Sequence, residues 1–162
     1  MEGLHVAVVE RERAALDVAA ALDFVSDPHF GGIATFIGRV RDHNVGRRVT
    51  GISYDLFVPL ALNQFRAIGE RALAEVGAPL KLWIVHAKGQ LAIGDPAVVV
   101  AAGTPHRDEA FRACRLAIEA VKHEAPIWKQ EHYVDGDSAW SEGCSLCEED
   151  RAHTHAAHGH AH

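Results

Sequence analysis

The chain lacks the features of a membrane-spanning or secreted protein. Its longest apolar run, Ala97–Ala102, is far shorter than the roughly 20 residues that cross a bilayer. The first residues, MEGLHVAVVERER, place His5 inside a short apolar stretch that alternating charges follow, which is not a signal-peptide pattern. The 3 cysteines are an odd number and do not form a framework of paired disulfides. We therefore expect a cytoplasmic protein without a membrane segment.

Basic residues are also in deficit. The 16 Lys and Arg residues face 22 Asp and Glu residues, which gives a formal net charge of −6. Nonspecific nucleic-acid binding needs the opposite balance, so we exclude it. The sequence has no P-loop and no GxGxxG motif, which makes a nucleotide-binding module the weakest alternative. The deficit still permits a local basic pocket for a small anion.

The composition and length fit one globular domain, because 162 residues with 48% hydrophobic content can bury a core. Helical periodicity and end signals predict helices over Ala14–Val25 and Pro59–Val76, and a third helix that Thr104 caps, with Pro105 at its first position. Pro126 ends the third helix. Strands are expected over Leu4–Val9, Ile33–Val40, Val49–Phe57, Leu80–Ala87, Ala97–Ala102, Lys129–Val134 and Ala139–Glu142.

The order of these elements favours an α+β fold. We expect a hairpin-like pair on either side of the polar loop Arg41–Arg48, and a closing hairpin around Asp135-Gly136-Asp137. Hairpins mixed with helices indicate a mixed or antiparallel sheet with packed helices, over residues 1–143. Cys114 is expected to be a small core residue. Residues 144–162 are acidic, then rich in Ala and His, and are predicted to be a disordered tail.

Two cationic segments are candidates for anion binding. Arg39 and Arg41 are two residues apart on a strand, so they share a face and suit a clamp for phosphate or carboxylate. The alternative is a solvated strand end. His106 and Arg107 stand where a buried strand turns into a helix, and a helix N-terminus favours anions. The alternative here is a helix cap with two exposed polar residues.

A third cationic segment, VKHEAPIWKQE, holds Lys122 and Lys129. Apolar neighbours, among them Pro126 and Trp128, predict that these lysines are partly desolvated. Desolvated lysines serve as acids, bases or nucleophiles. The alternative is a pair of surface lysines, with Lys122 complementing the helix C-terminus.

The tail contains a possible metal-binding sequence. Cys144 and Cys147 form a CxxC pair ahead of His153 and His155, which is a half-site for zinc. An ordered second pair of ligands is missing unless the tail supplies it, so a structural or adventitious zinc and no metal at all both stay open. A non-enzymatic metal-handling module is the competing functional hypothesis.

Together and in this order, three segments resemble the large subunit of molybdopterin synthase: GGIATFIGRVRDHNVG (Gly31–Gly46), IVHAKGQLAIGDPAVVVAAGTPHRDEAF (Ile84–Phe111) and VKHEAPIWKQE (Val121–Glu131). The resemblance covers roughly residues 4 to 143, with a loose match at Tyr54–Leu60, and leaves the tail outside.

This resemblance implies an α/β-hammerhead-like fold and a sulfurtransferase of molybdenum cofactor biosynthesis. The implied substrate is cyclic pyranopterin monophosphate, whose dithiolene sulfurs come from the thiocarboxylated C-terminal glycine of a small ubiquitin-like subunit. The implied assembly is a heterotetramer, with a homodimer of large subunits and a small subunit at each end. No redox cofactor or catalytic metal is implied.

The resemblance also implies roles for single residues. Lys122 is the first candidate for catalysis, beside the incoming thiocarboxylate, and Lys129 is the second, as a group that moves a proton. The implied substrate-binding residues, of which His106 and Arg107 belong to the same or the neighbouring protomer, are Arg39, Val40, Arg41, His106, Arg107, Lys122, Lys129, Gln130 and Glu131.

Overall fold

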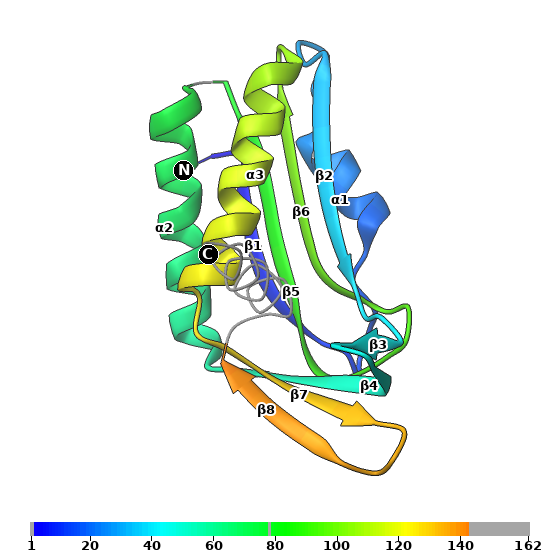
Figure 1. Cartoon of the computed structure of the whole chain (residues 1–162). Helices are drawn as coiled ribbons and strands as arrows, with labels where there is room; N and C mark the ends of the chain where they lie inside the picture. The colour runs from blue at the N-terminus through cyan, green and yellow to red at the C-terminus, as the bar shows by residue number, and fades with distance from the viewer. Residues whose placement is uncertain (1, 78, 143–162) are drawn as a thin grey trace, which may run out of the picture.

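The computed structural model describes residues 2–77 and 79–142 and confirms the α+β class (Figure 1). Within these residues, eight strands form the sheet and three helices pack on it. The strands are β1 (Leu4–Glu10), β2 (Gly32–Arg39), β3 (His43–Asn44), β4 (Arg47–Leu56), β5 (Lys81–Ala92), β6 (Pro96–Thr104), β7 (Ile127–Tyr133) and β8 (Ser138–Glu142). The helices are α1 (Val18–Val25), α2 (Val58–Val76) and α3 (Arg107–Glu124).

The long strand β5 joins two parts of the sheet. Its first part pairs with β1 in parallel and with β6 antiparallel, and β6 pairs in turn with β2. Its last residues pair with β4, which continues to β7 and β8. The change of partner falls at Gly89, whose φ of +102° is a conformation that side chains other than glycine rarely adopt. In Figure 1, β4, β7 and β8 therefore lie across the lower end of the other strands.

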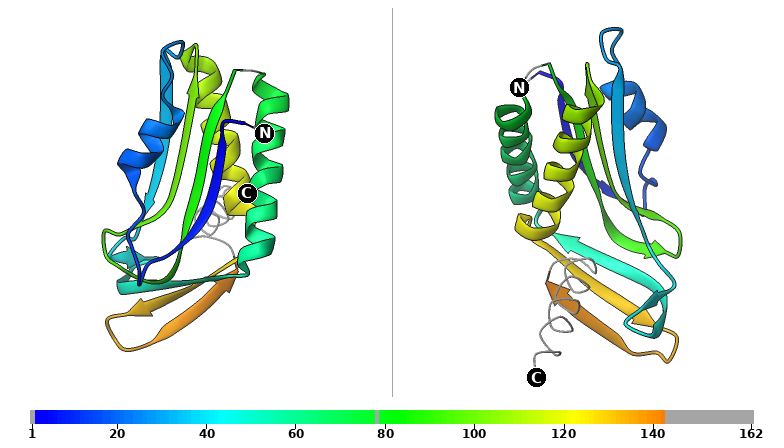
Figure 2. Two further views of the ribbon diagram at one scale, coloured as in Figure 1. Left: turned by 180° about the vertical axis from the view of Figure 1, so that it is seen from behind. Right: turned by 45° about the horizontal axis from the view of Figure 1, so that its top comes forward.

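The helices cover the two faces of the β1-β5-β6-β2 part of the sheet. Helices α2 and α3 lie side by side on one face, and α1 lies on the other (Figures 1 and 2). The Asp17 carboxylate caps α1 by accepting a hydrogen bond from the Ala20 N–H at 3.0 Å. Pro59 lies in the first turn of α2, and Gly77, with a φ of 82°, ends that helix as predicted.

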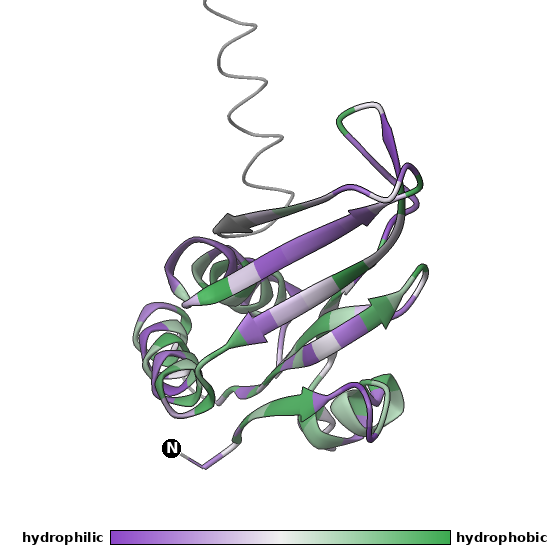
Figure 3. Ribbon diagram, turned by 90° about the horizontal axis from the view of Figure 1, so that it is seen from below, coloured by the Kyte–Doolittle hydropathy of each residue, from purple (hydrophilic) through white to green (hydrophobic). Residues whose placement is uncertain are grey.

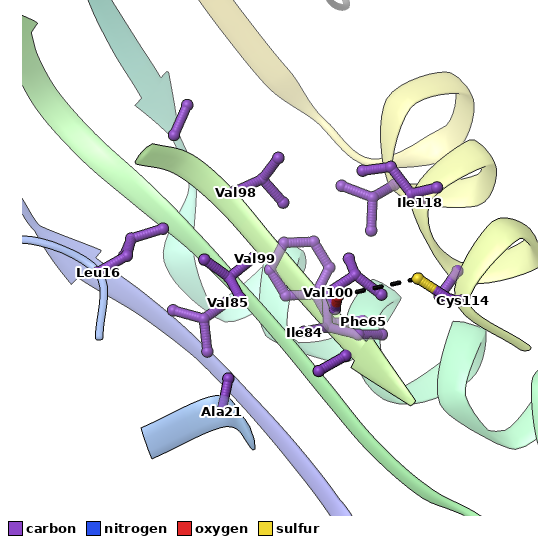
Figure 4. Packing of buried hydrophobic residues seen from close by; sticks show 14 of the residues in the cluster. Leu16, Ala21, Phe65, Ile84, Val85, Val98, Val99, Val100, Cys114 and Ile118 are labelled. Atoms are coloured by element: carbon purple, nitrogen blue, oxygen red, sulfur yellow. Dashed lines mark hydrogen bonds between the residues drawn. The ribbon is translucent and has the colours of Figure 1, made fainter. Parts of the chain in front are cut away.

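The core lies between the sheet and these helices. Phe65 of α2, Ile84 of β5 and Val100 of β6 are fully buried there (Figure 4). Both α2 and α3 carry hydrophobic and hydrophilic residues (Figure 3), as expected of helices with one buried side. Cys114 is buried in this core, which confirms its prediction, and burial raises the pKa of its thiol to about 11. No helix of the described chain is long and apolar enough to cross a membrane.

The expected pairing around the polar loop is wrong. Strand β2 pairs with β6, whereas β4 pairs with β3, β5 and β7. The loop itself folds into a small hairpin, in which Asn44 pairs with Arg47 around Val45 and Gly46. Both turn residues have positive φ, 48° and 75°, as in the tight turns of two-residue hairpins. This turn sends the chain away from β2 into the other part of the sheet.

The predicted starts of two helices are also wrong. Thr104 is not a cap, because pairing with Gly32 extends β6 through Thr104, and its hydroxyl donates to the His106 carbonyl at 2.6 Å. Helix α3 starts only at Arg107. Helix α1 starts at Val18 rather than at Ala14, because Asp17 supplies its cap. The closing hairpin forms as predicted, between β7 and β8.

Candidate functional site

Three cationic side chains meet at a cavity of about 280 Å³ between β2, β4 and the end of α3. Arg39 ends β2, Arg41 follows it, and Lys122 lies in the last turn of α3. The residues that line the cavity are Phe36, Ile37, Gly38, Arg39, Arg41, Tyr54, Ala97 and Lys122. Three positive charges around one partly apolar cavity favour a bound anion.

The arginine pair is held in place by the turn between β5 and β6. The Arg39 side chain donates from Nε to the Gly94 carbonyl at 3.0 Å. Val40 between the arginines is buried, and its N–H donates to the Asp95 carbonyl at 3.0 Å. Val40 therefore anchors the backbone between the arginines. Both arginines line the cavity, but β2 ends at Arg39, so Arg41 is not on the strand as predicted.

Lys122 also lies at one end of a larger groove, of about 490 Å³, between β2 and α3. Apolar side chains, including Phe36, Phe111 and Ile118, line much of this groove. Phe36 and Lys122 border both the groove and the smaller cavity. The lysine is half-buried, which confirms the predicted partial desolvation.

Lys129 is more deeply buried than predicted, with 0% of its surface exposed. Its Nζ lies 2.8 Å from Glu131 Oε1. In the register of β4 and β7 it stands opposite Tyr54, which lines the cavity, so the two side chains are on the same face. Lys129 itself is not among the described residues that line the cavity.

Glu131 is the buried partner of several donors. Its Oε2 accepts hydrogen bonds from Asn44 Nδ2 at 2.7 Å and from the Tyr133 hydroxyl at 2.8 Å. Burial acts to raise the pKa of this carboxyl, but the hydrogen bonds from Lys129, Tyr133 and Asn44 outweigh burial and hold the pKa below its ordinary value. Glu131 is therefore an ionised group at neutral pH.

Comparison with known proteins identifies the family. Residues 11–124 match the family described as MoaE protein. The chain belongs to the MoaE family. It is 45% identical over 144 residues to the molybdopterin synthase catalytic subunit of Synechococcus elongatus, covering 89% of this chain and 87% of the relative. It is 43% identical over 121 residues to catalytic subunit 1 of Mycobacterium tuberculosis, covering 75% and 82%.

Solved structures of MoaE-family proteins have the same fold. Molybdopterin synthase from Staphylococcus aureus superposes with a TM-score of 0.76 at 30% identity, over 83% of this chain and 94% of that one. A chain from the complex of subunits 1 and 2 of the Helicobacter pylori molybdopterin-converting factor has a TM-score of 0.68 over 84% and 89%. At 23% identity the latter likeness concerns the fold.

Three of the predicted site residues lie away from the cavity of this MoaE-family chain. His106 and Arg107 are exposed at the start of α3, whereas Lys122 is in its last turn. At 1.5 Å per residue, about 22 Å of helix separate Arg107 from Lys122. Gln130 points to the face of β7 opposite Lys129, and its amide donates to Ser138 Oγ at 3.0 Å.

The structure adds Tyr54 and His86 to the site of this MoaE-family chain. His86 is fully buried on β5, and its ring meets that of Tyr54 edge-on at 5.0 Å between centroids. Burial, and after it the charge of Lys122, lower the pKa of His86 to about 3, so the imidazole is neutral. A histidine inside the apolar strand IVHA was the available signal, because such a polar group needs a reason to be buried.

Within residues 2–77 and 79–142, no group of three or more His, Cys, Asp or Glu side chains is arranged to hold a metal ion. The proposed zinc ligands Cys144, Cys147, His153 and His155 lie outside the described residues. The predicted disorder of the tail also concerns residues outside that part of the chain.

Proposed function

We propose that this chain is the catalytic subunit of a molybdopterin synthase, which transfers sulfur from a thiocarboxylated small subunit to cyclic pyranopterin monophosphate. The observation that carries the proposal is the convergence of Arg39, Arg41 and Lys122 on one cavity, in a chain of the MoaE family. Relatives that are 45% and 43% identical bear the name of this catalytic subunit.

The charges of the cavity suit two anionic reactants. A phosphate on the pterin and a thiocarboxylate on the donor repel each other, and cations between them lower the energy of their approach. We assign Arg39 and Arg41 to the phosphate, with Val40 holding the backbone between them. Lys122 then neutralises the thiocarboxylate and the carboxylate that remains after sulfur transfer.

Lys129 is assigned a proton transfer as the cyclic phosphate opens. Its ammonium is held by Glu131 at 2.8 Å, and its register partner Tyr54 lines the cavity. Only the Tyr54 side chain is then expected to lie between the Lys129–Glu131 pair and the reactants in the cavity. The scheme uses no cofactor, and zinc binding by the tail remains a separate prediction.

The assembly is part of the same proposal. The donor is a small ubiquitin-like subunit, consistent with the two-subunit complex that the Helicobacter pylori factor forms. A second copy of this chain supplies His106 and Arg107, because both lie at the far end of α3 from Lys122. The resulting heterotetramer works in the cytoplasm.

Reconstitution with the thiocarboxylated small subunit and the cyclic precursor tests the function. Dithiolene formation is expected from the native chain, and Lys122→Ala is expected to lower its rate about 100-fold, the usual cost of losing one group that stabilises developing charge. Lys81→Ala is the matched control. Lys81 is also half-buried, but it lies at the start of β5, where it bonds to Ser26 and Asp27. Product without the small subunit, or full activity of Lys122→Ala, contradicts the proposal.

A further inference from the structure

Asn44 reaches from the small β3–β4 hairpin into the buried pair on β7. Its side chain is buried, with 8% of the residue exposed, and Nδ2 donates to Glu131 Oε2 at 2.7 Å across 87 positions of sequence. The next residue, Val45, has a φ of 48°, which is strained for a β-branched side chain. The turn thus holds an unfavourable backbone conformation directly beside the residue that contacts Glu131.

Both oxygens of Glu131 are occupied by donors. Lys129 Nζ lies at Oε1, while Asn44 and the Tyr133 hydroxyl share Oε2. The Arg47 guanidinium covers the Tyr133 ring at 3.6 Å and pairs with Asp135 and Asp137. Among the described residues, the charged and titratable groups near the carboxylate are Lys129 and Tyr133 on β7, and Arg47 and Tyr54 on β4, where Tyr54 stands opposite Lys129. The cross-strand neighbours Ile52 and Ala139 are uncharged.

The orientation of the Asn44 amide follows from this arrangement. An ionised carboxylate only accepts hydrogen bonds, so Nδ2 must face Glu131 and Oδ1 must point away. Oδ1 is buried and has no hydrogen-bond partner within the described chain. The unsatisfied buried oxygen costs stability, whereas the Nδ2 donor of the same side chain stabilises the buried Glu131 carboxylate. Packing alone does not account for asparagine here.

We infer that Asn44 is a positioning residue for the sulfur transfer, which acts through Glu131 to hold Lys129 fixed beside the cavity. The inference rests on the proposed function, in which Lys129 moves a proton. Tyr133 supplies the second donor to the same carboxylate oxygen, and Arg47 holds the tyrosine ring. The tip of the β3–β4 hairpin, residues 43–47, thereby becomes part of the site, although none of these five is among the described residues that line the cavity.

Two substitutions at this position shift the pH dependence in opposite directions. Asn44→Leu keeps the bulk and removes a donor, so the pKa of Glu131 rises and the acid limb of kcat/KM moves up by about one pH unit. Asn44→Asp acts differently, because a protonated Asp donates to Glu131 as the amide does, while an ionised Asp repels it. This variant is expected to keep activity at low pH and to lose it about 10-fold as pH rises.

The experiment measures dithiolene formation with the full complex between pH 5 and 9 for the native chain and both variants. Asn63→Leu is the control, because Asn63 is an exposed asparagine on α2 that bonds to Arg66, and its profile should match that of the native chain. The pKa of Glu131, followed by carboxyl NMR, gives a readout that does not depend on turnover and should rise in Asn44→Leu. Tyr133→Phe should shift the acid limb in the same direction as Asn44→Leu.

The outcomes separate the two levels of the proposal. An inactive native complex refutes the proposed function, whatever the variants do. An active native complex whose variants keep its pH profile, or lose activity equally at every pH, refutes the role of Asn44. An unchanged pKa of Glu131 in a folded Asn44→Leu chain refutes it independently of activity.

Discussion

Lys129 and Glu131 form an ion pair that solvent barely reaches, since Lys129 is 0% and Glu131 3% exposed. A buried pair gives the fold little net stability when intact, because desolvation offsets the attraction. Removing one partner is costly, because the other charge stays buried alone. This asymmetry makes the pair a sensitive point of the protein, apart from any role in the reaction.

Lys129→Met is expected to lower the free energy of unfolding by about 3 kcal/mol, measured by urea denaturation at pH 7. The double variant Lys129→Met/Glu131→Leu should recover part of that loss, because no charge remains buried, while Asn44 and Tyr133 lose their acceptor. Lys81→Met is the control: Lys81 pairs with Asp27 at the surface, and its loss should cost under about 1 kcal/mol. A single variant as stable as the native chain would contradict the buried ion pair.

The pair also makes stability depend on pH. The folded pKa of Glu131 lies below its unfolded value, because the hydrogen bonds from Lys129, Tyr133 and Asn44 outweigh burial. Its stabilising effect is therefore fully present above the unfolded carboxyl pKa, and is lost as pH falls through the folded one. At this residue, charge and fold are linked through donors on two strands.

At the scale of elements, the β3–β4 hairpin places Asn44 against Glu131 but has an unfavourable backbone conformation at Val45 in its turn. Its two-residue turn requires positive φ at both positions, which Gly46 adopts freely and Val45, at 48°, does not. Asn is favoured at the first position of such turns because it tolerates this conformation.

Val45→Asn is therefore expected to raise the free energy of unfolding by about 1 kcal/mol, followed as an increase in Tm. Val45 is 81% exposed, so little packing is lost. Val134→Asn, at a residue 63% exposed and without positive φ, is the control and should change stability by less than about 0.5 kcal/mol. Equal effects of the two substitutions would show that the turn is not strained.

Element boundaries were predictable where a local signal existed. Pro59 and Gly77 marked the ends of α2 correctly, because proline fixes its own φ and glycine adopts a positive φ freely, whatever their tertiary contacts. Thr104-Pro105 misled, because the same residues also fit the end of a strand, and pairing with Gly32 decided between the two. The pairing of β2 with β6 rather than with β4 depends on contacts far apart in sequence.

For the whole molecule, the length of α3 is decisive. Helix α3 holds Arg107 and Lys122 about 22 Å apart, so one chain does not bring them to one cavity. If a second copy completes the site, each site of a two-fold symmetric dimer takes Lys122 from one protomer and Arg107 from the other.

Mixing inactive Arg107→Ala and Lys122→Ala chains tests this arrangement. After subunit exchange, half of the dimers are mixed and hold one intact site of two, so activity should return to about a quarter of the native value. Mixing two Lys122→Ala preparations is the control and should restore nothing. Failure of the first mixture, with exchange verified by mass, would place both residues in one protomer.

By itself, the sequence determined the α+β class, the family resemblance, and the cationic segments around Arg39, Arg41, Lys122 and Lys129. Composition, periodicity and short motifs are properties of short stretches of sequence, so they can be recognised without knowing the tertiary contacts. Tertiary structure alone decided which cations share a cavity, that Lys129 is buried against Glu131, and that Asn44, Tyr133 and His86 stand around them. Those relations arise from strand register and from the change of partner at Gly89 of β5, where pairing passes from β1 to β4, and no short stretch of sequence specifies them.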